Sequence, residues 1–165
     1  MITVLGIDPG IAKTGYGIIG KDADSFRFLD CGVFSTSPKL STGRRLHYIF
    51  DQILDLISQF NPDEASIESL YFAKNITSAI PVAQARGVAL LAMEQKEVPA
   101  YEYAPQEIKR AIVGNGRAEK SQVQELVRLL LGLQEIPKPD HAADALATAL
   151  CHCNSRDFLE RTKGK

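Results

Sequence analysis

Residues 2–10 read Ile-Thr-Val-Leu-Gly-Ile-Asp-Pro-Gly, an apolar run that ends in a single acid, Asp8, before a Pro-Gly turn. A short apolar run with this kind of stop predicts a strand that is buried on both faces, from Ile2 to Asp8. A carboxylate at the end of such a strand is costly to bury unless a positive group joins it. Asp8 is therefore informative about both fold and function.

Two other carboxylates occupy apolar settings far along the chain. Glu68 closes a short strand-like stretch at 64–68, and Asp144 lies in an apolar helical stretch that begins at 140. His141 lies three residues before Asp144, so the two side chains should share a helix face. Oxygen ligands are those that a hard divalent cation such as Mg²⁺ prefers. The three acids therefore predict a divalent-metal site, for which phosphoryl transfer is a common chemistry.

The pattern of apolar residues and turns predicts an α/β fold. Strands are expected at 14–20 and 26–34, where short turns make them antiparallel neighbours of the first strand. A helix at 42–60 then leads to a strand at 65–68, which should lie parallel to the first. The other expected elements are a helix at 75–96 with a bend at Pro81, a strand at 100–103, and helices at 105–113, 119–131 and 140 to about 154. The result is a five-stranded mixed sheet, with three antiparallel N-terminal strands and then parallel strands, flanked by helices.

This topology predicts how the acids meet. If the first and fourth strands are adjacent and parallel, Asp8 and Glu68 lie side by side at their carboxyl ends, where open α/β sheets form their ligand sites. The last helix can then bring His141 and Asp144 over the same edge. We expect its apolar stripe to hold it on the sheet; the stripe consists of Ala142, Leu146, Ala149 and Leu150.

Length and composition fit one globular domain. We expect the 165 residues to form one domain at 1–155 and a polar, disordered tail at 156–165. An apolar share of 45% and a charged share of 24% are ordinary for a globule. The net charge of −1 gives no bulk attraction to nucleic acid, so DNA binding would need basic residues gathered on one face.

The cysteines and the termini point to the cytoplasm. Cys31, Cys151 and Cys153 are an odd number without paired spacing, which fits a reducing compartment. The Cys151-His152-Cys153 stretch is a poor zinc motif, because residues two apart on a helix do not share a face. The N-terminus does not resemble a signal peptide, and no apolar run approaches the roughly 20 residues that span a bilayer. We expect a cytoplasmic protein without a membrane partner.

The motifs, taken in order, resemble the RuvC family. That family comprises the bacterial Holliday junction resolvases, or crossover junction endodeoxyribonucleases, of the RNase H-like superfamily. The resemblance runs from about Ile2 to Cys153. The matching segments are Gly-Ile-Asp-Pro-Gly at 6–10, Ile67-Glu68 before an aromatic pair, 73–75, 84–88, 109–116, 118–122 and His141-Ala-Ala-Asp144.

The resemblance implies a homodimer that resolves four-way DNA junctions in recombination and repair. It would nick two strands symmetrically, leaving 5′-phosphate and 3′-hydroxyl ends, with Mg²⁺ or Mn²⁺, two ions per active site, and with the RuvA–RuvB branch-migration complex as partner. The catalytic and metal-binding residues would be Asp8, Glu68, Asp144 and His141. Many family members carry aspartate at the position of His141, so Asp140 is an alternative for completing the site.

The resemblance also suggests residues that contact DNA. Lys109 and Lys120 match positions where the family places basic residues near the scissile phosphate, and Tyr71 matches an aromatic that stacks at the junction centre. Lys74 is a further DNA-binding candidate. Other candidates for the basic face are Lys13, Arg86, Arg110 and Arg117. The small residues between Ala79 and Ala92 are our candidate dimer interface.

Parts of the sequence also fit three other functions. The stretch Asp8-Pro9-Gly10, with Gly15 and Gly17, resembles a phosphate loop of actin-like ATPases and sugar kinases, but those enzymes need two domains and this chain is too short. A YqgF-type RNase H-like nuclease that processes RNA is a nearer alternative, disfavoured by the segment at 109–120. A non-catalytic junction-binding module would require the three acids to lie apart, more than about 8 Å, too open for paired metals.

Overall fold

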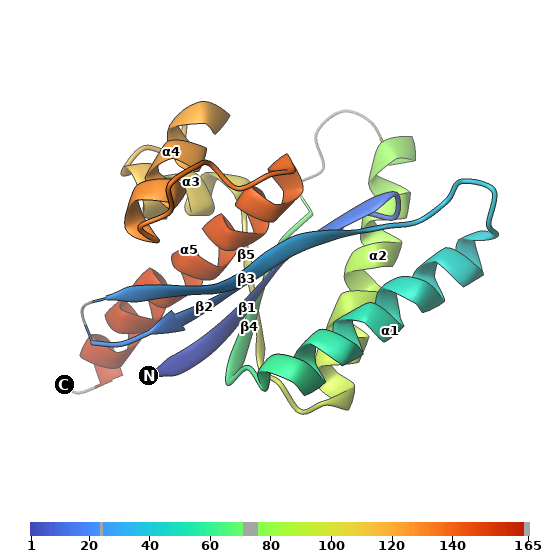
Figure 1. The fold of residues 1–165 in the computed structure, drawn as a ribbon, viewed down its shortest axis with the longest axis horizontal. Helices are drawn as coiled ribbons and strands as arrows, with labels where there is room; N and C mark the ends of the chain where they lie inside the picture. Colours follow the sequence, from blue (N-terminus) through green and yellow to red (C-terminus); the bar gives the residue numbers. More distant parts are fainter. Residues whose placement is uncertain (24, 71–75, 164–165) are drawn as a thin grey trace.

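The computed structural model describes the backbone of residues 1–23, 25–70 and 76–163, and its elements follow the predicted order (Figure 1). The elements are β1 (Ile2–Asp8), β2 (Lys13–Lys21), β3 (Phe26–Ser35), α1 (Thr42–Phe60), β4 (Glu64–Glu68), α2 (Ile76–Gln95), β5 (Ala100–Tyr103), α3 (Pro105–Val113), α4 (Lys120–Leu130) and α5 (Asp140–Lys163). Ser41 caps α1 by accepting a hydrogen bond from the Arg44 amide, and Asn61 ends it in a left-handed conformation. Among the described residues, no helix has the length and apolar character to cross a membrane.

The five strands form one mixed sheet in the order β3-β2-β1-β4-β5. The pairs β1–β2 and β2–β3 are antiparallel, whereas β4 is parallel to β1 and β5 is parallel to β4. Ile7 is level with Ile67 in the β1–β4 register, so Asp8 and Glu68 end neighbouring strands at the same edge. This topology confirms the predicted fold class and the predicted placement of the two acids.

Helices cover both faces of the sheet (Figure 1). On one face α1 and α2 enclose a core that includes Ile53 and Ala89. On the other face α5 crosses the strands, with α3 and α4 packed against it, and this second core includes Leu146 and Val127. The three layers leave the carboxyl ends of β1 and β4 beside the start of α5.

Glycines allow α5 to lie directly on β1 and β2. A Cβ atom at Gly6 would overlap the carbonyl oxygen of Ala145, and one at Gly15 would overlap that of His141. The helix backbone therefore approaches the sheet more closely than any side chain would permit. The predicted apolar stripe is fully buried in this contact: Ala142, Leu146, Ala149 and Leu150.

The last helix is longer than the predicted range of 140 to about 154. Residues 156–163, expected as a disordered tail, continue α5 without a break as far as Lys163. The segment contains no glycine or proline that would stop a helix, and its polar character alone does not end one. The Arg156 Nε atom also lies 3.1 Å from Oε2 of Glu64, which ties the start of this segment to β4.

Candidate active site

Asp8 and His141 meet at the end of β1. His141 Nδ1 lies 2.7 Å from Oδ2 of Asp8, so the Nδ1–H tautomer donates to the carboxylate and leaves Nε2 free of that bond. Burial raises the pKa of Asp8, and the nearby Asp144 carboxylate raises it further, whereas the hydrogen bond from His141 opposes the shift. Asp8 is therefore held in an environment that favours an added positive charge.

Asp144 lies one turn further along α5 and is bound by a lysine. Lys120 Nζ donates to Oδ2 of Asp144 at 2.9 Å and lies 3.4 Å from Oδ2 of Asp140. These carboxylates raise the pKa of Lys120, although its partial burial acts in the opposite direction. Lys120 is the first residue of α4, so its position is fixed by the packing of α4 against α5.

Glu68 lies in the same cleft as Asp144 and Lys120. The cleft has a volume of about 250 Å³, and its lining residues are Glu68, Pro105, Ile108, Lys109, Lys120, Val123, Asp144 and Ala147. Burial raises the pKa of Glu68 to about 7; Asp8 and Asp144 raise it as well, against the opposing effect of Lys120 and Lys109. The three carboxylates are thus close enough to destabilise one another's charge.

This donor set fits a divalent metal. One ligand atom each from Asp8, His141 and Asp144 can be chosen so that all three lie within 4.8 Å of one another. Partly buried carboxylates that repel one another are stabilised by a cation placed between them. Because His141 contacts Asp8 whereas the Asp140 side chain is 67% exposed and faces Lys120, His141 is better placed than Asp140 to complete the site.

The other predicted residues have different outcomes. Lys109 and Lys120 both line the cleft. Tyr71 and Lys74 lie outside the described residues. Arg86 is less available than expected, because its guanidinium forms an ion pair with Glu102 and is only 26% exposed.

A buried polar cluster between α5 and the strands β4 and β5 was not predicted. His152 is 1% exposed; its Nε2 lies 2.7 Å from Oε2 of Glu64 and its Nδ1 lies 2.8 Å from the hydroxyl of Tyr103. Burial lowers the pKa of His152, so the neutral ring donates to Glu64 and accepts from Tyr103. The cluster joins β4, β5 and α5. A histidine inside an apolar helical stretch was the only signal in the sequence.

Both sequence and structure comparisons give one family. A family model described as "Crossover junction endodeoxyribonuclease RuvC" matches residues 4–152. The RuvC of Treponema denticola is 56% identical over 157 residues, covering 95% of this chain and 88% of the relative. The Thermus thermophilus RuvC structure aligns with a TM-score of 0.88 at 38% identity, over 95% of this chain and 96% of that one. The structure of T. thermophilus RuvC in complex with Holliday junction substrate aligns with a TM-score of 0.91 at 37% identity, over 96% of both chains. The chain belongs to the RuvC family of crossover junction endodeoxyribonucleases, with an RNase H-like fold.

Proposed function

We propose that this protein is a structure-specific endonuclease that resolves Holliday junctions in recombination and repair. It nicks two DNA strands symmetrically and leaves 5′-phosphate and 3′-hydroxyl ends. The observation that carries the proposal is the convergence of Asp8, His141 and Asp144 at the sheet edge, in a chain whose relative was solved with a Holliday junction substrate. The four-way DNA junction is thus the proposed substrate and the principal partner.

Asp8, Glu68, His141 and Asp144 are the proposed catalytic and metal-binding residues. They would hold Mg²⁺, or Mn²⁺ in its place, with two ions per active site. Bound there, the ions would activate the attacking water and stabilise charge on the leaving 3′ oxygen. The repulsion among Asp8, Glu68 and Asp144 supports this proposal, because it makes the site selective for added positive charge.

The remaining polar side chains position the Asp8 carboxylate and bind the DNA. His141 donates to Asp8 and so fixes the carboxylate relative to α5. Lys120 and Lys109 place two ammonium groups at the cleft, where they contact phosphates of the substrate strand. Tyr71 and Lys74 remain proposed DNA contacts, with Tyr71 stacking on a base at the junction centre.

A cleavage assay tests the function. Purified protein is mixed with a labelled synthetic four-way junction, with and without Mg²⁺, beside a linear duplex of the same sequence. We expect paired nicks at symmetric positions in the junction, only with the metal, and none in the duplex. Binding without cleavage on several junction sequences would support the junction-binding module instead. Cleavage of structured RNA alone would support a YqgF-type activity.

We also propose that the protein acts as a homodimer, because two symmetric nicks need two active sites. The exposed face of α2 supports this: Ile80 is 53% exposed and Leu91 is 59% exposed, and Ala83 and Gly87 are exposed on the same face. The RuvA–RuvB complex is the proposed partner in branch migration. Action on DNA and three free cysteines support a cytoplasmic location.

The dimer is tested by placing a charge on α2. Leu91→Glu should convert a dimer into a folded monomer at micromolar concentration, measured as mass by light scattering. Burying an unpaired carboxylate at an interface is strongly unfavourable. Leu129→Glu is the matched control, because Leu129 is 55% exposed on α4 and should leave the mass unchanged. A monomeric wild type, or a Leu91→Glu variant that remains dimeric, would contradict the proposed interface.

A further inference from the structure

A second cleft lies beside the C-terminal end of α3. It has a volume of about 660 Å³, and its lining residues are Gln106, Arg110, Gly114, Asn115, Gly116 and Arg117. None of these six residues lines the cleft of Glu68, Asp144 and Lys120, called here the catalytic cleft. Lys109, the neighbour of Arg110 in the sequence, does line it. Adjacent helix residues point about 100° apart. One helix, α3, therefore contributes a cation to each of the two clefts.

The loop after α3 fixes where the two arginines stand. Gly114 ends the helix with a φ of 83° and its amide donates to the Arg110 carbonyl at 2.8 Å. The Oδ1 atom of Asn115 accepts a hydrogen bond from the Arg117 amide at 2.9 Å. A Cβ atom at Gly116 would lie only 3.7 Å from Nη2 of Arg110, so this guanidinium lies against the loop. The loop and the helix end form one wall of the cleft.

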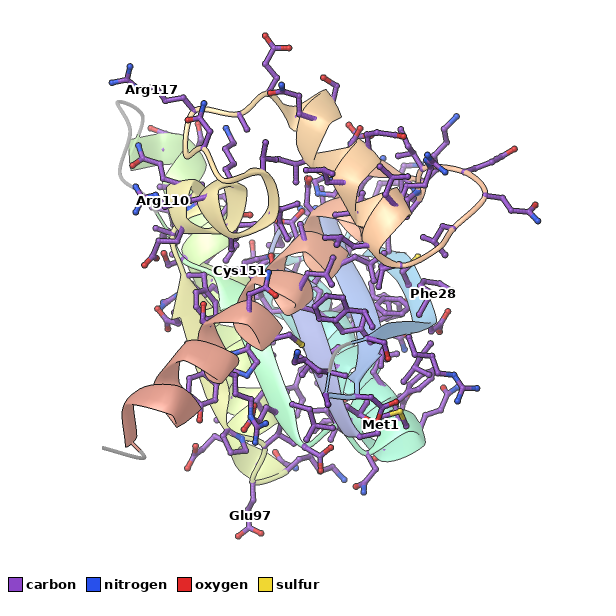
Figure 2. All side chains as sticks on the ribbon, turned by 90° about the vertical axis from the view of Figure 1, so that its left-hand side faces the viewer. Met1, Phe28, Glu97, Arg110, Arg117 and Cys151 are labelled. Atoms are coloured by element: carbon purple, nitrogen blue, oxygen red, sulfur yellow. The ribbon has the colours of Figure 1, made fainter. Side chains whose placement is uncertain are left out.

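The two guanidinium groups at this cleft lack acidic partners. Within the described part of the chain, neither Arg110 nor Arg117 forms an ion pair, whereas Arg86 and Arg128 pair with Glu102 and Glu125. Figure 2 shows Arg110 and Arg117 projecting outward at the same corner of the molecule. Two cations that share a polar cleft without a counter-charge favour the binding of an anion.

The surrounding segment has a local positive charge. Residues 105–120 carry four cations against two acids, in a chain whose net charge is −1. The cations are Lys109, Arg110, Arg117 and Lys120, and the acids are Glu107 and Glu119. One of the acids is engaged locally, because Glu107 Oε2 accepts a hydrogen bond from the Ala104 amide. The α3–α4 segment is therefore a region of this chain with an excess of positive charge, as DNA binding requires.

We propose that the cleft of Arg110 and Arg117 binds a DNA backbone phosphate outside the catalytic cleft. This site rests on the proposed function, and it extends the path of the DNA strand from Lys109 along α3. A guanidinium presents paired donors that match phosphate oxygens. The glycines at 114 and 116 have no side chains that would keep a sugar–phosphate backbone away. The contact fixes the position of the strand and does not read its sequence.

The salt dependence of junction binding tests this site. Affinity is measured by fluorescence anisotropy with a chelator present, so that no cleavage occurs, over a series of salt concentrations. Each of Arg110→Ala and Arg117→Ala should reduce the slope of log K against log salt by about one and weaken binding about fivefold at fixed salt. The loss of affinity should be the same for junctions of different sequence. Arg110→Lys, which keeps the charge, should retain the wild-type slope.

Arg27→Ala is the matched control. Arg27 is likewise exposed, but it lies on β3 level with Gly20, at the end of the sheet remote from Asp8. An unchanged slope in both arginine-to-alanine variants at 110 and 117, equal to that of Arg27→Ala, would overturn the phosphate site. Weaker binding with an unchanged slope would also overturn it, because the contact would not be ionic. Failure of the wild type to bind or cut the junction would instead contradict the proposed function.

Discussion

Replacing Asp8 by asparagine is expected to lower Mg²⁺-dependent junction cleavage by at least about 10³-fold while junction binding is kept. The amide removes a charged ligand from the group formed with His141 and Asp144. Transition-state charge stabilisation by a metal is worth several kcal/mol, and each 1.4 kcal/mol corresponds to a factor of about ten in rate. Asp8 is only 15% exposed at the end of β1, so it offers little surface for direct contact with DNA.

The Asp8→Asn protein should also fold normally. Asparagine has nearly the same shape and can still accept the hydrogen bond from His141 Nδ1. Because burial and Asp144 raise the pKa of Asp8, removing its charge also removes a repulsion. A second readout is the rise in melting temperature on adding Mg²⁺, which should be present in the wild type and reduced in the variant. Retained cleavage, or loss of junction binding together with cleavage, would contradict the assigned role.

The second large effect is expected on stability, in the absence of metal. Folding raises the pKa of Glu68 from 4.5 to about 7. Below pH 4.5 the carboxyl is protonated in both the folded and the unfolded states. Between pH 4.5 and 7 the unfolded chain loses this proton while the folded chain keeps it, so the free energy of unfolding falls as the pH rises. Above pH 7 the whole effect is present, and it amounts to roughly 3 kcal/mol.

Glu68→Gln should remove this fall in the free energy of unfolding between pH 4.5 and 7. In the presence of a chelator, the variant is expected to be more stable than the wild type at pH 8, by about 2–3 kcal/mol, and nearly equal to it at pH 4.5. Urea unfolding at the two pH values measures the difference. Glu94→Gln is the control, because Glu94 is exposed on α2 and its replacement should not change the pH profile relative to the wild type. Parallel stability curves for Glu68→Gln and the wild type would exclude the raised pKa.

The same carboxylate repulsion explains why metal should matter more to the wild type. A divalent cation among Asp8, Glu68 and Asp144 would offset the charge that folding brings together. The stabilisation by Mg²⁺ at pH 8 should therefore be larger in the wild type than in Glu68→Gln. This site stores unfavourable electrostatic energy in the absence of metal, as active sites commonly do.

Most of the fold was readable because its signals are local. The apolar run that ends at Asp8 depends on a few adjacent residues, and the structure confirms it as β1. The helix predicted at 42–60 is also confirmed, and its ends at Ser41 and Asn61 are set by local residues. The parallel pairing of β1 with β4 followed from the helix between them. The end of α5 was misjudged because polarity was taken as a sign of disorder, although a helix needs a specific stop.

Contacts between elements that are distant in the sequence could not be predicted from it. The bond from Lys120 to Asp144 joins the start of α4 to α5, and the Glu64–His152–Tyr103 cluster joins three elements. Neither has a local signature, because each requires the relative positions of packed helices and strands. A lysine at 120 was read as a phosphate contact, but its pairing with Asp144 appears only once α4 is seated on α5.

The sequence by itself determined the order of the elements, the family resemblance and the acids that would meet at one edge of the sheet. These follow from the spacing of apolar residues, from turn residues and from short sequence motifs, all of which can be recognised within short stretches of the chain. The tertiary structure decided which neutral or charged group stands beside each acid: His141 against Asp8, and Lys120 between Asp144 and Asp140. The physical reason is that burial and Coulomb interaction depend on distances of a few ångströms between elements, and only packing sets those distances.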